Sequence, residues 1–266
     1  MFKNIRRNFV LAGCALGLSM ASLSAAQAQT ALADIMAAKV IKIGIPTDFP
    51  PYGYVGPDLQ PQGLDVEMGK YIGEKLGIKV DLIPVTSPNR IPYLQTKRAD
   101  LIISTLGKSP DREKVIDFTA AYAPFFSAVY GPKNVSVTSF ADLAGKSVSV
   151  VRGAFEDVDL TKMAPAQTDI KRFEDNNATV SAYVSGQANL IATGAAVAES
   201  MIQRNPQLNT EYKLTTRLSG CYIGVPKGED ALRLKINEII AAGIKNGDLE
   251  KLSQKYLKRG LGDLPG

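Results

Sequence analysis

The sequence predicts an α/β fold built from two similar halves, and three observations support this fold class. Apolar strand-like segments alternate with helical segments, a pattern typical of βαβ units and a parallel sheet. The alternation occurs twice, first over residues 40–104 and again over residues 147–204. Two extended segments, residues 120–133 and 218–226, follow the two halves. We therefore expect two successive βαβαβ units.

The first half is predicted to run strand, helix, strand, helix, strand. Strands are expected at residues 40–45 ("VIKIGI"), 78–85 and 101–104, and helices at residues 65–76 and 91–96. In the longer helix Met68, Ile72 and Leu76 recur at a spacing of four, and Gly77 is a natural stop. Residues 46–63 are dense in proline and glycine, which predicts a loop.

The second half repeats the pattern. Strands are expected at residues 147–151, 170–173 and 190–193, and the helical segments are "GAFEDVDLTKM", "NNATVSAYVSG" and residues 197–204. Two further helices, residues 231–244 and 249–256, lie on either side of "NGD", a turn signal.

Residues 1–28 resemble a secretory signal peptide. "MFKNIRRNF" is a positive start, "VLAGCALGLSMASLSA" is an apolar stretch, and "AQA" at residues 26–28 is a small-residue cleavage site. "LAGC" also resembles a lipoprotein box, which would tether the chain through a lipid on Cys14. Only about five apolar residues separate Arg7 from Cys14, however, and an export signal needs about 7–15. We expect cleavage near Ala28 and a soluble periplasmic product.

Composition excludes several classes of function. Removing the three basic residues of the signal peptide from the formal charge of +5 leaves +2, which gives no support for nucleic-acid binding. The chain has no histidine, which excludes triads with a histidine base and histidine-ligated metals. Cys221 is the single cysteine after cleavage, so we expect a buried thiol and no internal disulfide. We expect no metal, no cofactor and a monomer.

The segment "LIISTLGKSPDR" is the first candidate site. Small polar groups gather where its apolar strand ends, at Ser104, Thr105 and Gly107. Ligands of open α/β sheets sit outside the carboxyl ends of strands, where hydroxyls and backbone N–H groups can bind an anion. Arg112 adds a planar fork of donors that suits a carboxylate. In the alternative interpretation the hydroxyls cap a turn and Arg112 pairs with Asp111 or Asp117.

A family resemblance adds to this interpretation. The segments "VIKIGIPTDFPPYGY", "GLDVEMGKYIGEKLG", "ADLIISTLGKSPDREKVIDFTAAY", "LAGKSVSVVRGAFED" and "NGDLEKLSQKYL" occur in this order. Together they resemble the periplasmic solute-binding proteins of ATP-driven importers, specifically the polar amino-acid-binding family. The resemblance implies a type II periplasmic-binding-protein fold, in which two lobes, each a mostly parallel sheet flanked by helices, are joined by two hinge crossings.

The resemblance also implies the domain boundaries and the function. Lobe 1 would comprise residues 29–127 and 221–266, and lobe 2 residues 128–220. The protein would capture a small polar solute with an anionic head group, an amino acid or a related carboxylate or zwitterion, and deliver it to the membrane permease of an ABC importer. The alternative is an enzyme that resembles the cyclohexadienyl dehydratases, with Glu156 or Asp48 as the general acid.

The resemblance places the ligand between the lobes. Phe49 or Tyr52, in a loop whose aromatics favour a ligand-facing position, would stack on the ligand, and Arg112 would pair with its carboxylate. The helix start at residues 153–155 would offer backbone N–H groups from lobe 2. The complete set of expected ligand-binding residues is Asp48, Phe49, Tyr52, Ser87, Asn89, Arg90, Ser104, Thr105, Gly107, Arg112, Ala154, Phe155, Glu156 and Thr193.

Three places in the chain depart from the family pattern. Gly107 stands where the family usually has a small hydroxyl, and Ala154-Phe155 stands where it usually has threonine. Gly194 stands where it usually has the aspartate that holds the ligand's ammonium group, and an ammonium buried without a carboxylate would be costly.

Two explanations of the missing aspartate stay open. Glu156 or Asp48 replaces it, or the ligand is a carboxylate, a sulfonate or a methylated amine held by aromatic rings. Phe155 is alternatively a core residue, and Glu156 a solvated acid in the first turn of a helix. Arg90 and Arg152 either pair with additional negative charge on the ligand or are surface charges.

Overall fold

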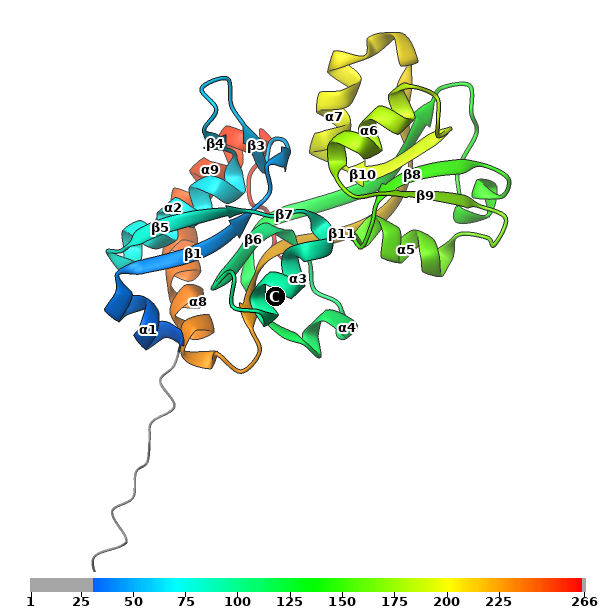
Figure 1. The fold of residues 1–266 in the computed structure, drawn as a ribbon. Helices are drawn as coiled ribbons and strands as arrows, with labels where there is room; N and C mark the ends of the chain where they lie inside the picture. The colour runs from blue at the N-terminus through cyan, green and yellow to red at the C-terminus, as the bar shows by residue number, and fades with distance from the viewer. Residues whose placement is uncertain (1–30, 265–266) are drawn as a thin grey trace, which may run out of the picture.

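The structure, a computed structural model, describes residues 31–264 of the chain. The predicted signal peptide and the lipid-anchor motif at Cys14 lie outside the described residues. The described chain forms two lobes joined by two long strands (Figure 1). In the described part of the chain, no helix is both long enough and apolar enough to cross a bilayer.

One eight-stranded sheet runs through both lobes in the order β5-β1-β6-β11-β7-β10-β8-β9. In one lobe β1 is parallel to β5 and β6, and in the other β8 is parallel to β9 and β10. The long strands β7 and β11 are antiparallel to each other and connect the two parallel sets. The strands are β1 (Val40–Ile45), β5 (Lys79–Pro84), β6 (Leu101–Leu106), β7 (Ile116–Pro132), β8 (Ser147–Val151), β9 (Asp169–Phe173), β10 (Leu190–Gly194) and β11 (Thr210–Pro226).

Helices cover the sheet in both lobes (Figure 1). The first lobe carries α1 (Ala31–Ala38), α2 (Leu64–Leu76), α3 (Arg90–Gln95) and α4 (Pro110–Glu113), with the 3-10 turn η1 (Ser87–Asn89) before α3. The second lobe carries η2 (Phe140–Leu143), α5 (Phe155–Met163), α6 (Asn176–Val184), α7 (Ala195–Arg204) and η3 (Pro206–Leu208). The last helices, α8 (Asp230–Lys245) and α9 (Asp248–Leu257), return to the first lobe, as the resemblance implies.

Residues 46–63 are only partly the loop that the sequence predicts. This segment holds a second, three-stranded antiparallel sheet made of β2 (Asp48–Phe49), β3 (Gly53–Val55) and β4 (Pro61–Gln62). Strands of two or three residues are too short to show the apolar–polar alternation by which a strand is recognised.

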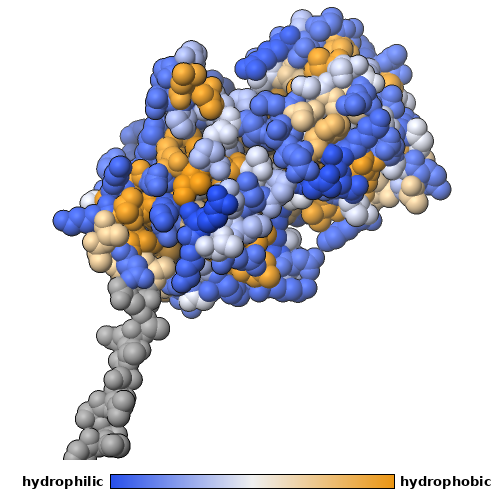
Figure 2. All heavy atoms as spheres, viewed as in Figure 1, coloured by the Kyte–Doolittle hydropathy of each residue, from blue (hydrophilic) through white to orange (hydrophobic). Residues whose placement is uncertain are grey.

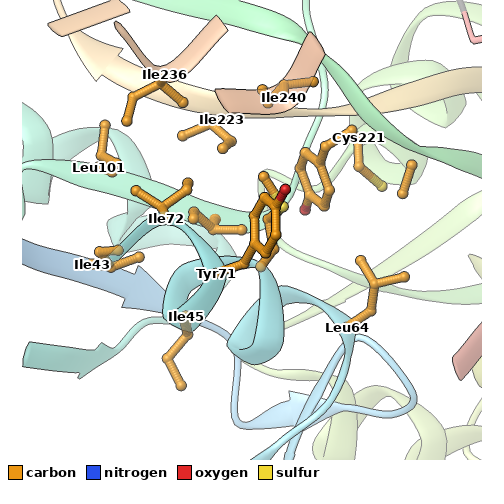
Figure 3. Close-up of a cluster of buried hydrophobic side chains, with 14 of the residues drawn as sticks. Ile43, Ile45, Leu64, Tyr71, Ile72, Leu101, Cys221, Ile223, Ile236 and Ile240 are labelled. Carbon is orange, nitrogen blue, oxygen red and sulfur yellow. The ribbon is translucent and has the colours of Figure 1, made fainter. Parts of the chain in front are cut away.

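The core of the first lobe lies between the sheet and helices α2 and α8. Figure 3 shows Ile43, Leu101 and Ile223 of the sheet facing Ile72 of α2 and Ile236 of α8, and all five are fully buried. Each such side chain contributes about 1.5–3 kcal/mol by leaving water. The thiol of Cys221 belongs to the same cluster, which confirms that it is buried.

The second lobe is covered on both faces of its sheet. Val129 of β7 and Leu190 of β10 belong to one buried cluster. Their neighbours Tyr130 and Ile191 belong to another. Successive side chains of a strand point to opposite faces, so both faces of these strands are buried. This explains why β10 and the second-lobe part of β7 are mostly apolar, whereas the outer strand β9 is polar.

Strands β7 and β11 pair along nearly their whole length, with several register shifts. They are the two crossings between the lobes (Figure 1). The expected lobe boundaries, 127/128 and 220/221, fall inside these two strands, and their exact positions stay a prediction.

Candidate functional site

A narrow cavity of about 20 Å³ lies between the two lobes, within about 400 Å³ of unfilled space that is partly open to solvent. It is formed where strands β6, β8 and β10 end, so the carboxyl ends of strands from both lobes face one another across it. Its lining residues are Phe49, Ser87, Arg90, Thr105, Arg112, Phe125, Val151, Ala154, Phe155, Glu156, Asn176, Ala192 and Thr193.

The structure brings nine of the expected ligand-binding residues together in this lining: Phe49, Ser87, Arg90, Thr105, Arg112, Ala154, Phe155, Glu156 and Thr193. The other five expected residues are not part of the lining: Asp48, Tyr52, Asn89, Ser104 and Gly107. The lining also contains residues that the sequence analysis missed, namely Phe125, Val151, Asn176 and Ala192. Ligand contact by any of these residues stays a prediction.

Asp48 joins the lobes instead of lining the cavity. Its Oδ2 accepts hydrogen bonds from the backbone N of Asn176, at 2.6 Å, and from Nδ2 of the same residue, at 3.2 Å. Asp48 also lines a wider groove of about 540 Å³ whose lining includes Tyr54 and Arg204. The space-filling view shows a notch between the lobes beside the β3–β4 hairpin (Figure 2).

Three of the other expected residues support the lining from behind. Tyr52 stacks on Phe49 with ring centroids 5.5 Å apart, so the ring of Phe49 is the one that reaches the cavity. Oδ1 of Asn89 accepts a hydrogen bond from the backbone N of Thr86, at 3.0 Å, and closes the turn before α3. Ser104 is fully buried in β6, and its Oγ has no hydrogen-bond partner among the described residues.

Arg112 bridges the two lobes through its guanidinium group. Nη1 donates to the carbonyl oxygen of Gly107 at 3.0 Å, and Nη2 donates to the carbonyl oxygen of Gly153 at 2.8 Å. Burial, and next the charge of Arg90, lower the pKa of Arg112 to about 10, so it stays cationic at neutral pH.

The alternative in which Arg112 pairs with a neighbouring aspartate is wrong. Asp111 pairs with Lys114 at 2.8 Å, and Asp117 pairs with Lys227 at 2.7 Å. Both aspartates therefore have partners on the surface of the first lobe, and Arg112 is left to point into the cavity.

Arg90 and Arg152 occupy different environments. Arg90 is only 7% exposed and lines the cavity, so its interpretation as a surface charge is wrong. Burial lowers the pKa of Arg90, and the nearby acids Asp48, Asp65 and Glu156 act in the opposite direction. The side chain of Arg152 is 52% exposed and pairs with a glutamate, as expected of a surface charge.

Asp65, at the start of α2, holds the strand end that lines the cavity. It is completely buried, and it accepts hydrogen bonds from the backbone N of Thr105, at 2.8 Å, and from the hydroxyl of Tyr122, at 2.6 Å. Thr105 has a φ of +46°, a conformation that a threonine adopts only under constraint. Burial raises the pKa of Asp65 to about 7, against the effect of both hydrogen bonds.

A glycine before Asp65 is required by the backbone. Gly63 has a φ of +126°, and a side chain there would overlap the carbonyl oxygen of Tyr52. The Gly-x-Asp sequence at the start of α2 therefore combines a turn that only glycine permits with a buried acid that positions Thr105.

Glu156 and Phe155 form the wall contributed by α5. Glu156 is only 5% exposed, so its interpretation as a solvated acid is wrong. Burial raises its pKa to about 7, although Arg90 and Arg112 favour the charged form. The ring of Phe155 lies 4.5 Å from the guanidinium carbon of Arg112 and 4.2 Å from that of Arg217.

Aromatic rings fill the space at two of the positions that depart from the family pattern. A side chain at Gly107 would overlap the ring of Phe155. A Cβ at Gly194 would lie 3.1 Å from Cζ of Phe49 and 3.2 Å from Cε2 of Phe125. The departures at 107 and 155 are therefore coupled, and no room is left at 194 for a carboxylate unless the rings move.

Over residues 31–264, no group of three or more histidine, cysteine, aspartate or glutamate side chains has the arrangement of a metal site. The polar side chains that line the cavity carry guanidinium, hydroxyl and amide groups and one carboxyl group. These groups suit an organic anion rather than a metal ion.

Two α/β lobes that enclose a cavity at their strand ends define a ligand-binding protein of the type II periplasmic class. A family model matches residues 41–259, and the chain belongs to the bacterial extracellular solute-binding proteins, family 3. Both the family resemblance and the predicted fold class are confirmed.

Relatives of known sequence cover most of the chain. The L-arginine-binding protein of Pseudomonas aeruginosa is 26% identical over 230 residues, which are 82% of this chain and 88% of that protein. The ABC transporter glutamine-binding protein GlnH of Bacillus subtilis is 27% identical over 255 residues, 94% of this chain and 92% of the relative. Among solved structures, the solute receptor for L-cysteine of Neisseria gonorrhoeae superposes with a TM-score of 0.80 at 30% identity, over 87% of this chain and 95% of that one.

Proposed function

We propose that this protein captures a small polar solute, an amino acid or a related carboxylate or zwitterion, and delivers it to the membrane permease of an ABC importer. The names of the relatives support this proposal, since they are described as binding proteins or receptors for arginine, glutamine and cysteine. The observation that carries it is the cavity, in which Arg112 and Thr105 of one lobe face the start of α5 on the other.

The anionic head group of the solute would bind at the end of β6. A guanidinium has five N–H donors, and Arg112 uses two of its side-chain nitrogens on protein carbonyls, so donors remain for a carboxylate. The first turn of α5 adds backbone N–H groups that have no partner inside the helix. Phe49 would cover the apolar part of the solute.

Binding would favour the closed arrangement of the lobes. We assign residues up to 127 and from 221 onwards to lobe 1 and residues 128–220 to lobe 2. A solute that contacts both lobes binds the closed form more tightly than the open form, and it shifts the population by that difference. The contacts that Arg112 and Asp48 make across the lobes would add to this preference.

The protein would be exported to the periplasm by the predicted signal peptide, which is cleaved, and would act there as a monomer. We prefer capture to the dehydratase alternative because the matching relatives are described as binding proteins or receptors. An assay with prephenate and arogenate is expected to show no turnover.

The proposal is tested by identifying the solute. Mass spectrometry of material released by denaturing the purified protein, together with a thermal-shift screen of amino acids and organic acids, is expected to reveal a ligand. X-ray scattering is then expected to show compaction on addition of that ligand. Arg112→Ala is expected to lose most of the affinity, and Arg152→Ala, which removes an exposed arginine, serves as the control. A broad screen in which no small molecule changes stability or shape would refute the proposal.

A further inference from the structure

Arg90 is a buried cation whose partner is missing. Its side chain lines the cavity, the residue is 7% exposed, and its Nε is buried without a hydrogen-bond partner. Among the described residues, no carboxylate forms an ion pair with Arg90, whereas other arginines of this chain are paired, for example Arg172 and Arg217. An unpaired buried charge is costly, which indicates that the partner comes with the ligand.

The acids nearest to Arg90 do not take this place. Asp65 directs its two oxygens to the hydroxyl of Tyr122 and to the backbone of β6. Asp48 binds both the backbone N and the side-chain amide of Asn176. The carboxyl group of Glu156 is buried, and its raised pKa of about 7 leaves it only partly charged at neutral pH. The cavity therefore has more positive than negative charge.

Arg112 is the second cation of the same lining, and it has a different environment. Two of its nitrogens are held by the carbonyl groups of Gly107 and Gly153, so its position is fixed while further N–H groups remain for a ligand. Arg90 and Arg112 line the same cavity and carry like charges, so they repel each other, and this repulsion helps to lower the pKa of Arg112. Two cations in one closed cavity are best balanced by two anionic groups.

The part of the cavity near Gly194 offers no charge for a cation. The rings of Phe49 and Phe125 come within 3.1 and 3.2 Å of the place where a Cβ of residue 194 would be. Ala192 and Thr193 complete this region of the lining, and neither carries a charge. Recognition by charge is therefore concentrated at Arg90 and Arg112.

We infer that the ligand is a dicarboxylate, with or without an amino group, that places one carboxylate on Arg112 and the second on Arg90. Acidic amino acids and dicarboxylic organic acids share these two groups and belong to the same class. The inference rests on the proposed function and specifies its substrate. It also makes Arg90 the residue that distinguishes a dicarboxylate from its monoamide.

The experiment uses pairs of ligands that differ in one charge. Affinities of the purified protein are measured by calorimetry for L-glutamate and L-glutamine, for L-aspartate and L-asparagine, and for 2-oxoglutarate, succinate and L-arginine. In whichever of the two amino-acid pairs binds more tightly, the dicarboxylate is expected to bind at least about tenfold more tightly than its monoamide. In Arg90→Gln this ratio is expected to fall to within about threefold, whereas in Arg152→Gln it is expected to stay unchanged.

Arg90→Lys tests the charge apart from the shape, and it is expected to keep part of the preference for the dicarboxylate. Thermal unfolding of each variant shows whether it is folded. The inference is overturned if L-arginine or a monoamide binds as tightly as the best dicarboxylate, if no dicarboxylate binds, or if folded Arg90→Gln keeps the full ratio. Tight binding of another amino acid would overturn this inference alone, whereas a protein that binds no metabolite would remove the proposed function as well.

Discussion

The two walls of the cavity are built in different ways. On the first lobe, the end of β6 is held by a buried network around Asp65, and the cations Arg90 and Arg112 line the cavity beside it. On the second lobe, the wall consists of the ring of Phe155, a carboxyl group with a raised pKa and the short side chains at the end of β10. The first lobe therefore supplies the cations and a strand end fixed by buried hydrogen bonds, whereas the second lobe shapes and closes the cavity.

The largest effect is expected when the buried acid that supports the first wall, Asp65, is replaced. Asp65→Ala leaves the N–H of Thr105 and the hydroxyl of Tyr122 unsatisfied in a buried place, and we expect a loss of about 3–4 kcal/mol of unfolding free energy. The matched change in the second lobe is Asp157→Ala, whose buried carboxylate accepts hydrogen bonds from the backbone N of Gly153 and from a partly exposed arginine. Its expected loss is smaller because Gly153 is exposed and the arginine is partly exposed, so water can replace the lost acceptor. Denaturant unfolding measures both values. Equal losses would contradict the difference between the walls.

The second expected effect concerns the carboxyl group of the second wall. The folded pKa of Glu156, about 7, lies above its ordinary value of 4.5 because the group is buried, so the folded state binds more protons between these pH values. Its contribution to stability is therefore full below about pH 4.5 and is lost as the pH rises to about 7, by up to about 3 kcal/mol.

Glu156→Gln is expected to remove this part of the pH dependence. The pH dependence of the unfolding free energy that remains in the variant would come largely from Asp65, whose pKa is also raised to about 7 by burial. Unfolding free energies at pH 4.5, 6 and 8 for the wild type and the variant provide the measurement. A variant whose slope equals that of the wild type would show that Glu156 titrates normally.

A third prediction tests whether the walls fit each other. Gly107→Ser places a side chain where the ring of Phe155 lies, so we expect a loss of about tenfold in affinity for the ligand found in the screen. Phe155→Thr removes the ring, and the double variant is expected to recover affinity relative to Gly107→Ser alone. Calorimetry of all four proteins forms a complete cycle. Additive losses in the double variant would mean that the two positions are independent.

The smallest expected effect concerns closure without direct contact with the ligand. Asp48→Ala removes the acceptor of two hydrogen bonds from Asn176, so the closed form loses stability relative to the open form. We expect a decrease of about fivefold in affinity and a larger radius of gyration without ligand. Asp58→Ala, at an exposed turn of the first lobe, is the control. An unchanged radius would indicate that the contact between Asp48 and Asn176 does not govern closure.

Much of the framework could be predicted because strands and helices of the main sheet have strong local signals. Strands β1 and β8 begin and end where expected, and β5, β6, β9 and β10 differ by two residues or fewer at each end. The crossing strand β11 is much longer than predicted because residues 210–217, apart from the buried Leu214, are mostly polar and at least partly exposed, so they lack an apolar pattern. The short sheet within residues 46–63 and the brief α4 were missed for lack of any periodicity.

The candidate site was predictable where a motif supplied it and unpredictable where tertiary structure did. Arg112 and Thr105 follow from the end of an apolar strand. Val151 and Ala192 could have been found in the same way, since they also lie at or near strand ends. Phe125 comes from the middle of a crossing strand, and Asn176 depends on how α6 approaches Asp48, so no local signal marks either residue.

The register shifts between β7 and β11 have a mechanical consequence. The two strands stay bonded to each other across the junction, and the pairing slips at Tyr212/Leu214, Thr215/Arg217 and on both sides of Tyr222. Such irregularities bend and twist a ribbon without cutting it. The junction would thus bend elastically and not turn as a free pivot, because the paired strands stay bonded and deform mainly where the register shifts.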